Sequence, residues 1–240
     1  MIISTKGIVI SKIKFKENDL IVKCYTASNG IMSFLVKGVL SSKKSKLKSA
    51  YFQPLTMLKL EIDFKENREL HYIKGVRVNH NYNSLNTVIY KSTVVLFLSE
   101  ILAMVLKEEE PNQDLFIFIE TALLMFDSIE SNFFFHYQFL MGLTRYIGFP
   151  PDLSNSEYPF FNLESGCYEK ISSGGYCISG EKLKLFKSTL GMEFDKVKDK
   201  LLISSQKQQL LEIILLYFKL HFQGFKSPKS LEILNQVFNS

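Results

Sequence analysis

The hydrophobic pattern of this sequence changes its period near residue 80, and the change divides the chain into two kinds of structure. Between Leu58 and Phe64, apolar and charged residues alternate strictly, which is the pattern of a strand with one buried face. Similar short runs, rich in β-branched residues and separated by turn residues, predict five strands in all, at residues 7–15, 18–27, 31–38, 58–64 and 68–78. We therefore expect the first 80 residues to form a small β-structure.

Five short strands in a segment of this length are what a small closed barrel requires. Asn29-Gly30 lies between the second and third strands, where glycine can supply the positive φ of a hairpin turn. The fold we expect is the five-stranded OB-fold. An SH3-like barrel is the structural alternative, because periodicity alone does not distinguish the two.

After Asn83 the apolar residues recur at the spacing of an α-helix. The pattern predicts helices over residues 83–110, 112–129, 132–148, 180–190, 210–222 and 227–238, with Ser227 as the N-cap of the last. Several of these helices are apolar around most of their circumference, so they must pack on one another as a bundle. The turn-rich segment 150–180 is expected to form a small hairpin insert. The predicted class is α+β, with an OB-fold domain at 1–80 and a helical domain at 81–240.

The charged residues are divided in the same way. Residues 1–80 carry fifteen Lys and Arg against six Asp and Glu, a net charge of +9, whereas residues 81–240 carry fourteen against eighteen, a net charge of −4. The densest cluster lies at 36–54, where five lysines stand among serines without an acidic residue. A basic segment with aromatic residues nearby is typical of a surface that contacts nucleic-acid phosphates and stacks bases.

The candidate DNA-binding residues combine the lysines of this cluster and of the first strand with two aromatic residues near them. They are Lys12, Lys14, Phe15, Lys37, Lys43, Lys44, Lys46, Lys48 and Tyr51. Most other aromatic residues of the region are expected in the barrel core, and a loop that is merely solvated is the alternative for the lysines. Because lysine contacts phosphate as a point charge, little sequence specificity is expected.

The sequence contains no arrangement of side chains that catalysis or metal binding requires. The four histidines are isolated, and Cys167 and Cys177 have no second cysteine beside them, whereas a structural zinc site needs two close pairs of ligands. Residues 175–182 resemble a phosphate-binding loop faintly, but Glu181 stands where that motif needs lysine. No nucleophile motif occurs. We expect no catalytic residue, no metal, no cofactor and no enzymatic activity.

Three further observations concern the compartment. Three cysteines are too few for a disulfide framework, and the N-terminus lacks the pattern of a signal peptide. The longest apolar run, 93–106, is shorter than the ~20 residues that a membrane span needs, and it contains Glu100. We expect a cytoplasmic protein without contact to a membrane.

The succession of motifs resembles the RecO family of bacterial recombination mediators. The resemblance begins with "KGIVISKIKFKENDLIVKCYT" and "SNGIMSFLVKGVLSSKKSKLKSAYFQPLTMLKLEI", in which a glycine turn, a strand ending in Lys-Gly, a basic loop and Gln-Pro follow in order. It continues with "RYIGFPPDL", "FNLESG", "SSGGYCISGE" and "GFKSPKSLEIL", and so spans nearly the whole chain. No single motif is specific, and the order of all of them carries the resemblance.

The resemblance implies an N-terminal OB-fold, a helical C-terminal domain and no catalytic turnover. It also implies a nucleoid-associated protein that binds single- and double-stranded DNA, anneals complementary strands and helps to load recombinase onto coated DNA. The implied partners are RecR and the acidic C-terminal tail of the single-strand-binding protein. For that tail we nominate Arg145, Lys226 and Lys229, basic residues beside apolar helices.

The chain departs from the family at one site. Many members carry four cysteines in the insert, where this sequence has "LSNSEYPFF" without a cysteine and only Cys177 near the second pair. The zinc of those relatives is therefore not expected here. Two other functions are alternatives: a basic OB-fold that binds RNA in translation or ribosome assembly, and a nuclease, which would need a carboxylate cluster for metal ions.

Overall fold

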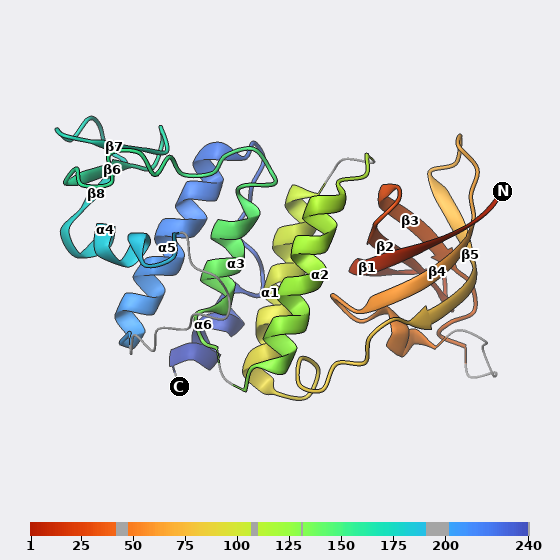
Figure 1. Cartoon of the computed structure of the whole chain (residues 1–240). Coiled ribbons are helices and arrows are strands. Elements are labelled where there is room, and N and C mark those ends of the chain that lie inside the picture. Colours follow the sequence, from red (N-terminus) through yellow and green to blue (C-terminus); the bar gives the residue numbers. More distant parts are fainter. Residues whose placement is uncertain (42–47, 107–109, 131, 191–201, 240) are drawn as a thin grey trace. The chain divides into compact units, whose positions relative to one another are not determined.

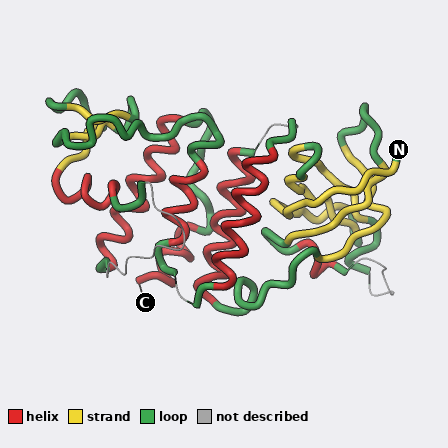
Figure 2. Tube along the Cα trace, in the orientation of Figure 1, coloured by secondary structure: helices red, strands yellow, loops and turns green. Residues whose placement is uncertain are grey.

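The computed structural model of the chain describes residues 1–41, 48–106, 110–130, 132–190 and 202–239. These residues belong to two compact units, one of residues 1–127 with 228–230 and one of residues 128–227 with 231–240. Figure 1 shows the elements along the chain, and Figure 2 shows that strands dominate its first part and helices the rest. This order of β-barrel and helices confirms the predicted fold class. The assignment of separate functional domains to 1–80 and 81–240 stays a prediction.

Five strands close into a barrel in the order β1–β2–β3–β5–β4. Their bounds are β1 (Ile2–Phe15), β2 (Asp19–Thr26), β3 (Gly30–Val36), β4 (Met57–Asp63) and β5 (Leu70–Val78). Neighbouring strands are antiparallel except for β3 and β5, which run parallel. A parallel pair between the third and fifth strands, with β4 on the far side of β5, is the Greek-key order of an OB-fold. The topology thus resolves the choice between the OB-fold and the SH3-like barrel in favour of the OB-fold.

A β-bulge between Val9 and Ser11 allows β1 to serve two partners. Residues 2–8 pair with β4, and residues 7–15 pair with β2. A bulge bends a strand and increases its twist, which the strand needs where a barrel turns a corner. It also adds one residue to the alternation, so the odd-numbered side chains of β1 point inwards before the bulge and outwards after it.

The barrel core is built from alternate residues of the strands. Val22, Phe34 and Leu60 have no exposed surface, as the alternating pattern of their strands predicts. Between β3 and β4, the short 3-10 helix η1 (Ser49–Phe52) adds the fully buried ring of Phe52 to the same core. Burial of one such side chain contributes about 2–3 kcal/mol to folding, so the barrel has an ample core for its size.

Helices α1 (Ile89–Val105) and α2 (Gln113–Ser128) follow the barrel. The sequence pattern predicted that the first helix starts at residue 83, but the structure starts it at Ile89. The backbone N–H groups of Asn83, Ser84 and Leu85 donate to the carboxylate of Asp127 at 2.8–3.2 Å, which anchors the turn that precedes the helix. Apolar periodicity does not report such a distant acceptor.

Lys91 is buried beside this carboxylate. Its ammonium group donates to Ser84 Oγ and to the carbonyl oxygen of Phe126, both at 2.8 Å. Burial lowers the pKa of Lys91, and the negative charge of Asp127 opposes that change. The linker between the barrel and α1 is therefore fastened to the end of α2 by a buried network of charged hydrogen bonds.

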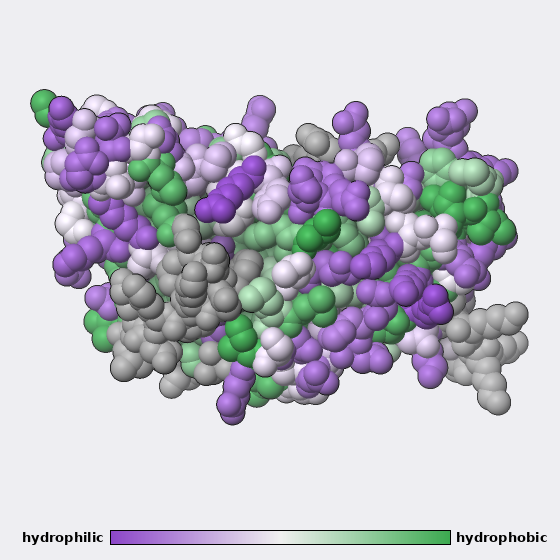
Figure 3. Space-filling view, viewed as in Figure 1, coloured by the Kyte–Doolittle hydropathy of each residue, from purple (hydrophilic) through white to green (hydrophobic). Residues whose placement is uncertain are grey.

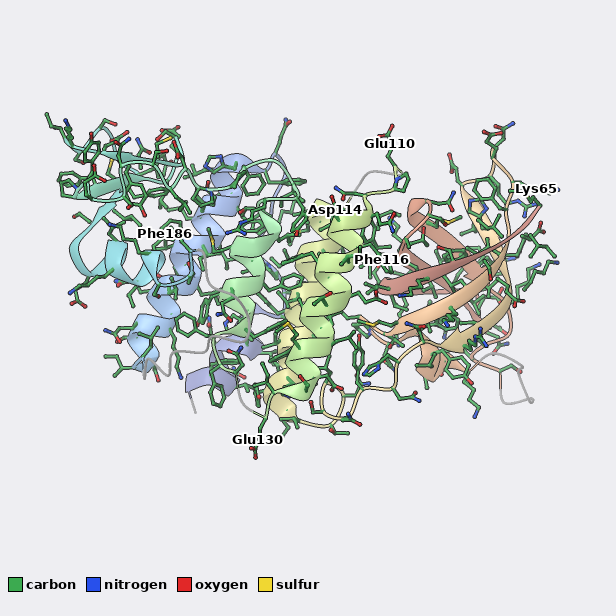
Figure 4. The ribbon with its side chains drawn as sticks, in the orientation of Figure 1. Lys65, Glu110, Asp114, Phe116, Glu130 and Phe186 are labelled. Carbon is green, nitrogen blue, oxygen red and sulfur yellow. The ribbon has the colours of Figure 1, made fainter. Side chains whose placement is uncertain are left out.

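The second unit combines helices with a small sheet. Its helices are α3 (Phe135–Leu143), α4 (Gly180–Lys187), α5 (Ser204–His221) and α6 (Leu231–Asn239). Strands β6 (Phe160–Asn162), β7 (Cys167–Glu169) and β8 (Cys177–Ser179) pair in the order β7–β6–β8. The insert is thus a three-stranded sheet, one strand more than the predicted hairpin. Phe186, which Figure 4 labels, packs with Phe161 and Tyr217 and is fully buried.

The last helix starts later than predicted. The pattern placed its N-cap at Ser227, whereas α6 starts at Leu231. Ser230 is buried, and both its N–H group and its hydroxyl donate to Glu100 Oε2 at 3.1 Å. This distant acceptor anchors the turn at residues 229–230, after which the helix begins. Among the helices in the described ranges, none has the length and apolarity that crossing a membrane demands.

Candidate nucleic-acid interface

One row of apolar side chains crosses the outer surface of the barrel. The strand register places Ile13 of β1 opposite Ile21 of β2, Ile21 opposite Leu35 of β3, and Leu35 opposite Tyr72 of β5. Residues directly opposite in a sheet point to the same face, and the residues that alternate with these on β2 and β3 are buried in the barrel core. These four side chains, the apolar row, therefore point outwards; Ile13 is 60% exposed and the other three are half-buried.

Another part of the outer barrel surface is covered by a helix, whereas the apolar row lies open. Tyr25 points outwards from β2 opposite Ile31, yet only 2% of it is exposed. Its ring lies 6.0 Å from that of Phe116 of α2, and its hydroxyl donates to the carbonyl oxygen of Asn112 at 3.0 Å. Figure 4 labels Phe116 on the side of α2 that faces the barrel. Helix α2 thus covers one end of β2, and the apolar row lies at the other end.

Cationic groups lie over the aromatic side chains at both ends of the row. Arg68 Cζ is 5.1 Å and Lys37 Nζ is 5.3 Å from the centre of the Tyr72 ring. At the other end, Lys16 Nζ is 5.4 Å from the centre of the Phe15 ring. Aromatic and aliphatic surface with cations at its edge is the combination that binds bases by stacking and phosphates by charge. The row therefore has the chemistry of a single-stranded nucleic-acid site.

A groove of about 640 Å³ extends the site along β2, β3 and the start of β5. Its lining includes Lys23, Ser33, Phe64, Arg68 and His71, together with Ala103 and Leu106 at the end of α1. The rings of Phe64 and His71 are stacked with their centres 5.3 Å apart. Glu66 and Glu69 also line the groove and balance the charges of Lys23 and Arg68, so the groove as a whole is not cationic.

The structure brings together some of the residues nominated from the sequence. Phe15 points outwards beside the apolar row, because it lies opposite Asp19 in the register that follows the bulge. Lys37 contacts the row through Tyr72. Lys48 is exposed immediately before η1. Lys43, Lys44 and Lys46 lie outside the described residues.

The other nominated residues of the barrel point elsewhere. Lys12 and Lys14 lie opposite Val22 and Leu20, so their side chains point to the opposite side of β1 from Phe15. Lys12 Nζ donates to Gln53 Oε1 at 3.0 Å, and partial burial lowers the pKa of Lys12. Tyr51 is half-buried against the barrel core and offers only part of its ring. Whether these three residues contact DNA stays a prediction.

Five residues of the interface were not nominated from the sequence: Ile13, Ile21, Leu35, Arg68 and Tyr72, the last of which was grouped with the aromatic residues expected in the core. Isoleucine and leucine in a strand are ordinarily assigned to the core. A signal was nevertheless present, because Ile21 has the same parity as Lys23 and Leu35 has the same parity as Ser33. For Ile13 the bulge reversed the parity, and the sequence did not reveal the bulge.

The residues nominated for the acidic tail are all exposed, but they do not form one site in either unit. Arg145, after α3, and Lys226 belong to the second unit, whereas Lys229 belongs to the first. Within the described residues, none of the three forms an ion pair with an acidic side chain. Their role stays a prediction for each residue separately.

The insert does not supply a zinc site in the part of the chain that the structure describes. Cys167 and Cys177 lie on the two strands that flank β6, both opposite Asn162. Their sulfur atoms donate to oxygen atoms, Cys167 to the carbonyl of Ser165 and Cys177 to Glu169 Oε2 and the carbonyl of Ser173. No group of three His, Cys, Asp or Glu in the described ranges could hold a metal ion. Two such cysteines do not fit a tetrahedral site of four ligands.

Comparison with known proteins agrees with this architecture. The family model described as recombination protein O, N terminal, matches residues 1–82, and the model described as recombination protein O, C terminal, matches residues 87–232. The chain is similar to a protein named DNA repair protein RecO from Christiangramia forsetii, with 41% identity over 99% of this chain and 100% of the relative. It is 43% identical to the protein of the same name from Flavobacterium psychrophilum, over the full length of both. The chain therefore belongs to the RecO family of DNA repair proteins.

Proposed function

We propose that the protein is a non-catalytic mediator of recombinational DNA repair that binds DNA through its barrel. In this proposal it anneals complementary strands and, together with RecR and the single-strand-binding protein, helps to load recombinase. The relatives' names support a role in DNA repair. The observation that carries the binding function is the apolar row, an open aromatic and aliphatic surface with cations over Tyr72 at one end and over the neighbouring Phe15 at the other.

The row favours single-stranded over double-stranded DNA as the first ligand. A base can stack on Tyr72 or lie against Ile13 and Leu35 only when it is not already stacked in a duplex. Each base that stacks on an aromatic side chain contributes about 1–3 kcal/mol, whatever its identity. Lys37 is exposed beside this ring and is the candidate contact for a flanking phosphate, whereas Arg68 is shared with Asp63, whose Oδ2 lies 3.7 Å from Arg68 Nη1. Such a site selects single strands without selecting a sequence.

Annealing follows from charge neutralisation. Two strands repel each other through their phosphates, and bound lysines reduce this repulsion and release condensed counterions. The net charge of +9 in the first 80 residues supports this role. The partners RecR and the acidic tail are proposed from the family, with Arg145, Lys226 and Lys229 as candidate contacts for the tail.

The test is strand annealing with purified protein and two complementary labelled oligonucleotides, bare or coated with single-strand-binding protein. We expect the protein to accelerate annealing of bare strands in dilute salt. We expect it to act on coated strands only when the single-strand-binding protein retains its acidic tail. Lack of acceleration on bare strands would contradict the annealing function, and equal activity on strands coated with the tail-less protein would contradict the tail as partner.

The same preparation separates DNA from RNA as the ligand. Competition between a single-stranded DNA and a structured RNA of equal length is expected to favour the DNA, since stacking on the row needs unpaired bases. Stronger binding of the structured RNA would favour a role in translation or ribosome assembly instead.

A further inference from the structure

Three cations lie side by side on a part of the barrel surface that the apolar row does not include. Lys6 of β1 lies opposite Lys59 of β4, and Lys59 lies opposite Arg77 of β5. Directly opposite side chains of antiparallel strands share one face, with Cβ atoms about 5 Å apart. All three residues are exposed, and we call them the cationic rung. Figure 3 shows hydrophilic residues gathered over β1 and β4 on this face.

Much of the charge of the cationic rung has no partner. Lys6 Nζ lies 2.9 Å from Glu120 Oε1 and 3.0 Å from Glu120 Oε2 of α2. Lys59 and Arg77 form no ion pair with any residue that the structure describes. Like charges directly opposite each other in a sheet are destabilising. A bound anion that spans Lys59 and Arg77 would remove that repulsion.

The surface around the cationic rung is hollowed. A hollow of about 440 Å³ is lined by Ser4, Thr5, Lys6, Lys59, Glu61, Gly75, Val76 and Arg77. Gly75 leaves room on β5, and the carboxylate of Glu61 lies across it, since a Cβ atom on Gly75 would be 2.7 Å from Glu61 Oε2. The hollow offers the Ser4 hydroxyl and cations but no aromatic ring, while the Thr5 hydroxyl donates to the carbonyl oxygen of Lys6. It therefore suits phosphates, and the carboxylate of Glu61 would repel a phosphate on one side of it.

We propose that the cationic rung holds the sugar–phosphate backbone of a second DNA segment while the apolar row holds the bases of the first. This inference rests on the proposed function, because it requires that the barrel binds DNA. Strand β1 contributes to both faces, with Lys6 and Ile13 seven residues apart, which corresponds to roughly 20 Å along a strand. One barrel can thus hold two segments at once and raise the local concentration of the second strand for annealing.

The test compares binding of a first and a second single strand to the full-length protein. Two oligothymidylates, which cannot pair, carry a donor and an acceptor fluorophore, and energy transfer between them reports a complex that holds both. The double substitution Lys59→Gln and Arg77→Gln is expected to weaken capture of the second strand about tenfold at physiological salt, because two phosphate contacts are lost. The affinity for the first strand should change less than twofold.

Two further variants sharpen the result. Lys65→Gln with Lys184→Gln changes the net charge equally at exposed sites off the cationic rung and should leave capture of the second strand unchanged. Glu61→Gln removes the carboxylate from the hollow and should strengthen that capture, by about twofold for a surface charge. Circular dichroism of each variant verifies that it is folded.

Several outcomes would overturn the inference. The first is that the Lys59/Arg77 variant loses affinity for the first and the second strand equally, and the second is that its capture of the second strand is unchanged. The third is that the control variant has the same effect. The fourth is a sedimentation measurement showing that each bridged complex contains two protein copies. If an acidic peptide binds the cationic rung and DNA bridging is not reduced, the rung belongs to a protein partner instead. If the wild-type protein binds no first strand in dilute salt, the proposed function itself fails, and this result is distinct from the others.

Discussion

The two outer faces of the barrel differ in chemistry although one strand, β1, crosses both. The apolar row presents aliphatic and aromatic surface with cations only at its ends, whereas the cationic rung presents three cations and no aromatic ring. The bulge between Val9 and Ser11 separates the two, because it reverses which side chains of β1 point outwards. The difference teaches that charge counted along a sequence does not define a binding surface. The register of the strands does.

The lysines of β1 illustrate this point. Lys6 lies in the rung beside Glu120, Lys12 is bound to Gln53, and Lys14 lies opposite the buried Leu20. All three look alike in the sequence. Only Lys6 joins other outward-pointing cations in register, so the faces can be tested by substitutions that affect one and spare the other.

The largest expected effect concerns the lysines between β3 and η1 in the sequence. Changing Lys43, Lys44, Lys46 and Lys48 to glutamate should weaken single-strand binding at least about tenfold, since up to four phosphate contacts are lost. The loss should be uniform across DNA sequences, as lysine contacts phosphates and not bases. Fluorescence anisotropy with oligonucleotides of different composition measures it. Unchanged affinity in dilute salt would remove this segment from the interface.

The next prediction distinguishes stacking of bases on the apolar row from binding of phosphates at the cationic rung. Tyr72→Ala should weaken binding of single strands about tenfold, because one stacked base contributes about 1–3 kcal/mol. Binding of a blunt duplex should change less than twofold, since paired bases cannot stack on the row. Tyr72→Phe keeps the ring and serves as the matched control, with affinity near that of the wild type. Equal losses for duplex and single strand would show that Tyr72 does not distinguish them by stacking.

The smallest expected effect on DNA binding comes from a substitution that touches neither face. Burial opposes ionisation of Asp127, but hydrogen bonds from Asn83, Ser84 and Leu85 outweigh it and lower the pKa of this carboxyl. Asp127→Asn should lower the free energy of unfolding by about 2 kcal/mol at neutral pH, since charged hydrogen bonds are lost. DNA affinity in the folded state should change less than twofold.

The pH dependence of stability checks the same carboxylate. A group whose pKa is lowered in the folded state stabilises above its unfolded pKa, near 4 for aspartate, and this contribution disappears as the pH falls through the folded value. Urea titrations followed by circular dichroism should therefore show a larger difference between wild type and Asp127→Asn at pH 7 than at pH 3. A constant difference at both pH values would contradict the role assigned to ionised Asp127.

Much of the fold could be predicted because local patterns determine it. The alternation from Leu58 to Phe64 gave β4 almost to the residue, and Gly30 adopts the positive φ that its turn requires. The starts of α1 and α6 were not predicted correctly, and the turns that precede them are anchored by Asp127 and Glu100, acceptors that are distant in the sequence. Hydrophobic periodicity contains no information about such partners.

The candidate interface could be derived from the sequence only in part. The nucleic-acid-binding barrel surface expected from the sequence stays a prediction, and of the residues nominated for it Phe15 and Lys37 lie at or beside the apolar row. The row itself depends on the register of four strands and on a bulge, neither of which can be derived from alternation alone. The cationic rung, likewise, joins three residues separated by up to 71 positions in the chain.

The salt dependence of single-strand binding, by the wild-type protein and by Tyr72→Ala, tests most directly whether this barrel surface holds DNA. For the wild type, the logarithm of the binding constant should fall linearly with the logarithm of the salt concentration, by about 0.7 for each phosphate contacted. Tyr72→Ala should give a parallel line about tenfold lower, because stacking does not depend on counterion release. An absence of binding in dilute salt, or an affinity that does not depend on salt, would contradict the claim that this barrel surface holds DNA.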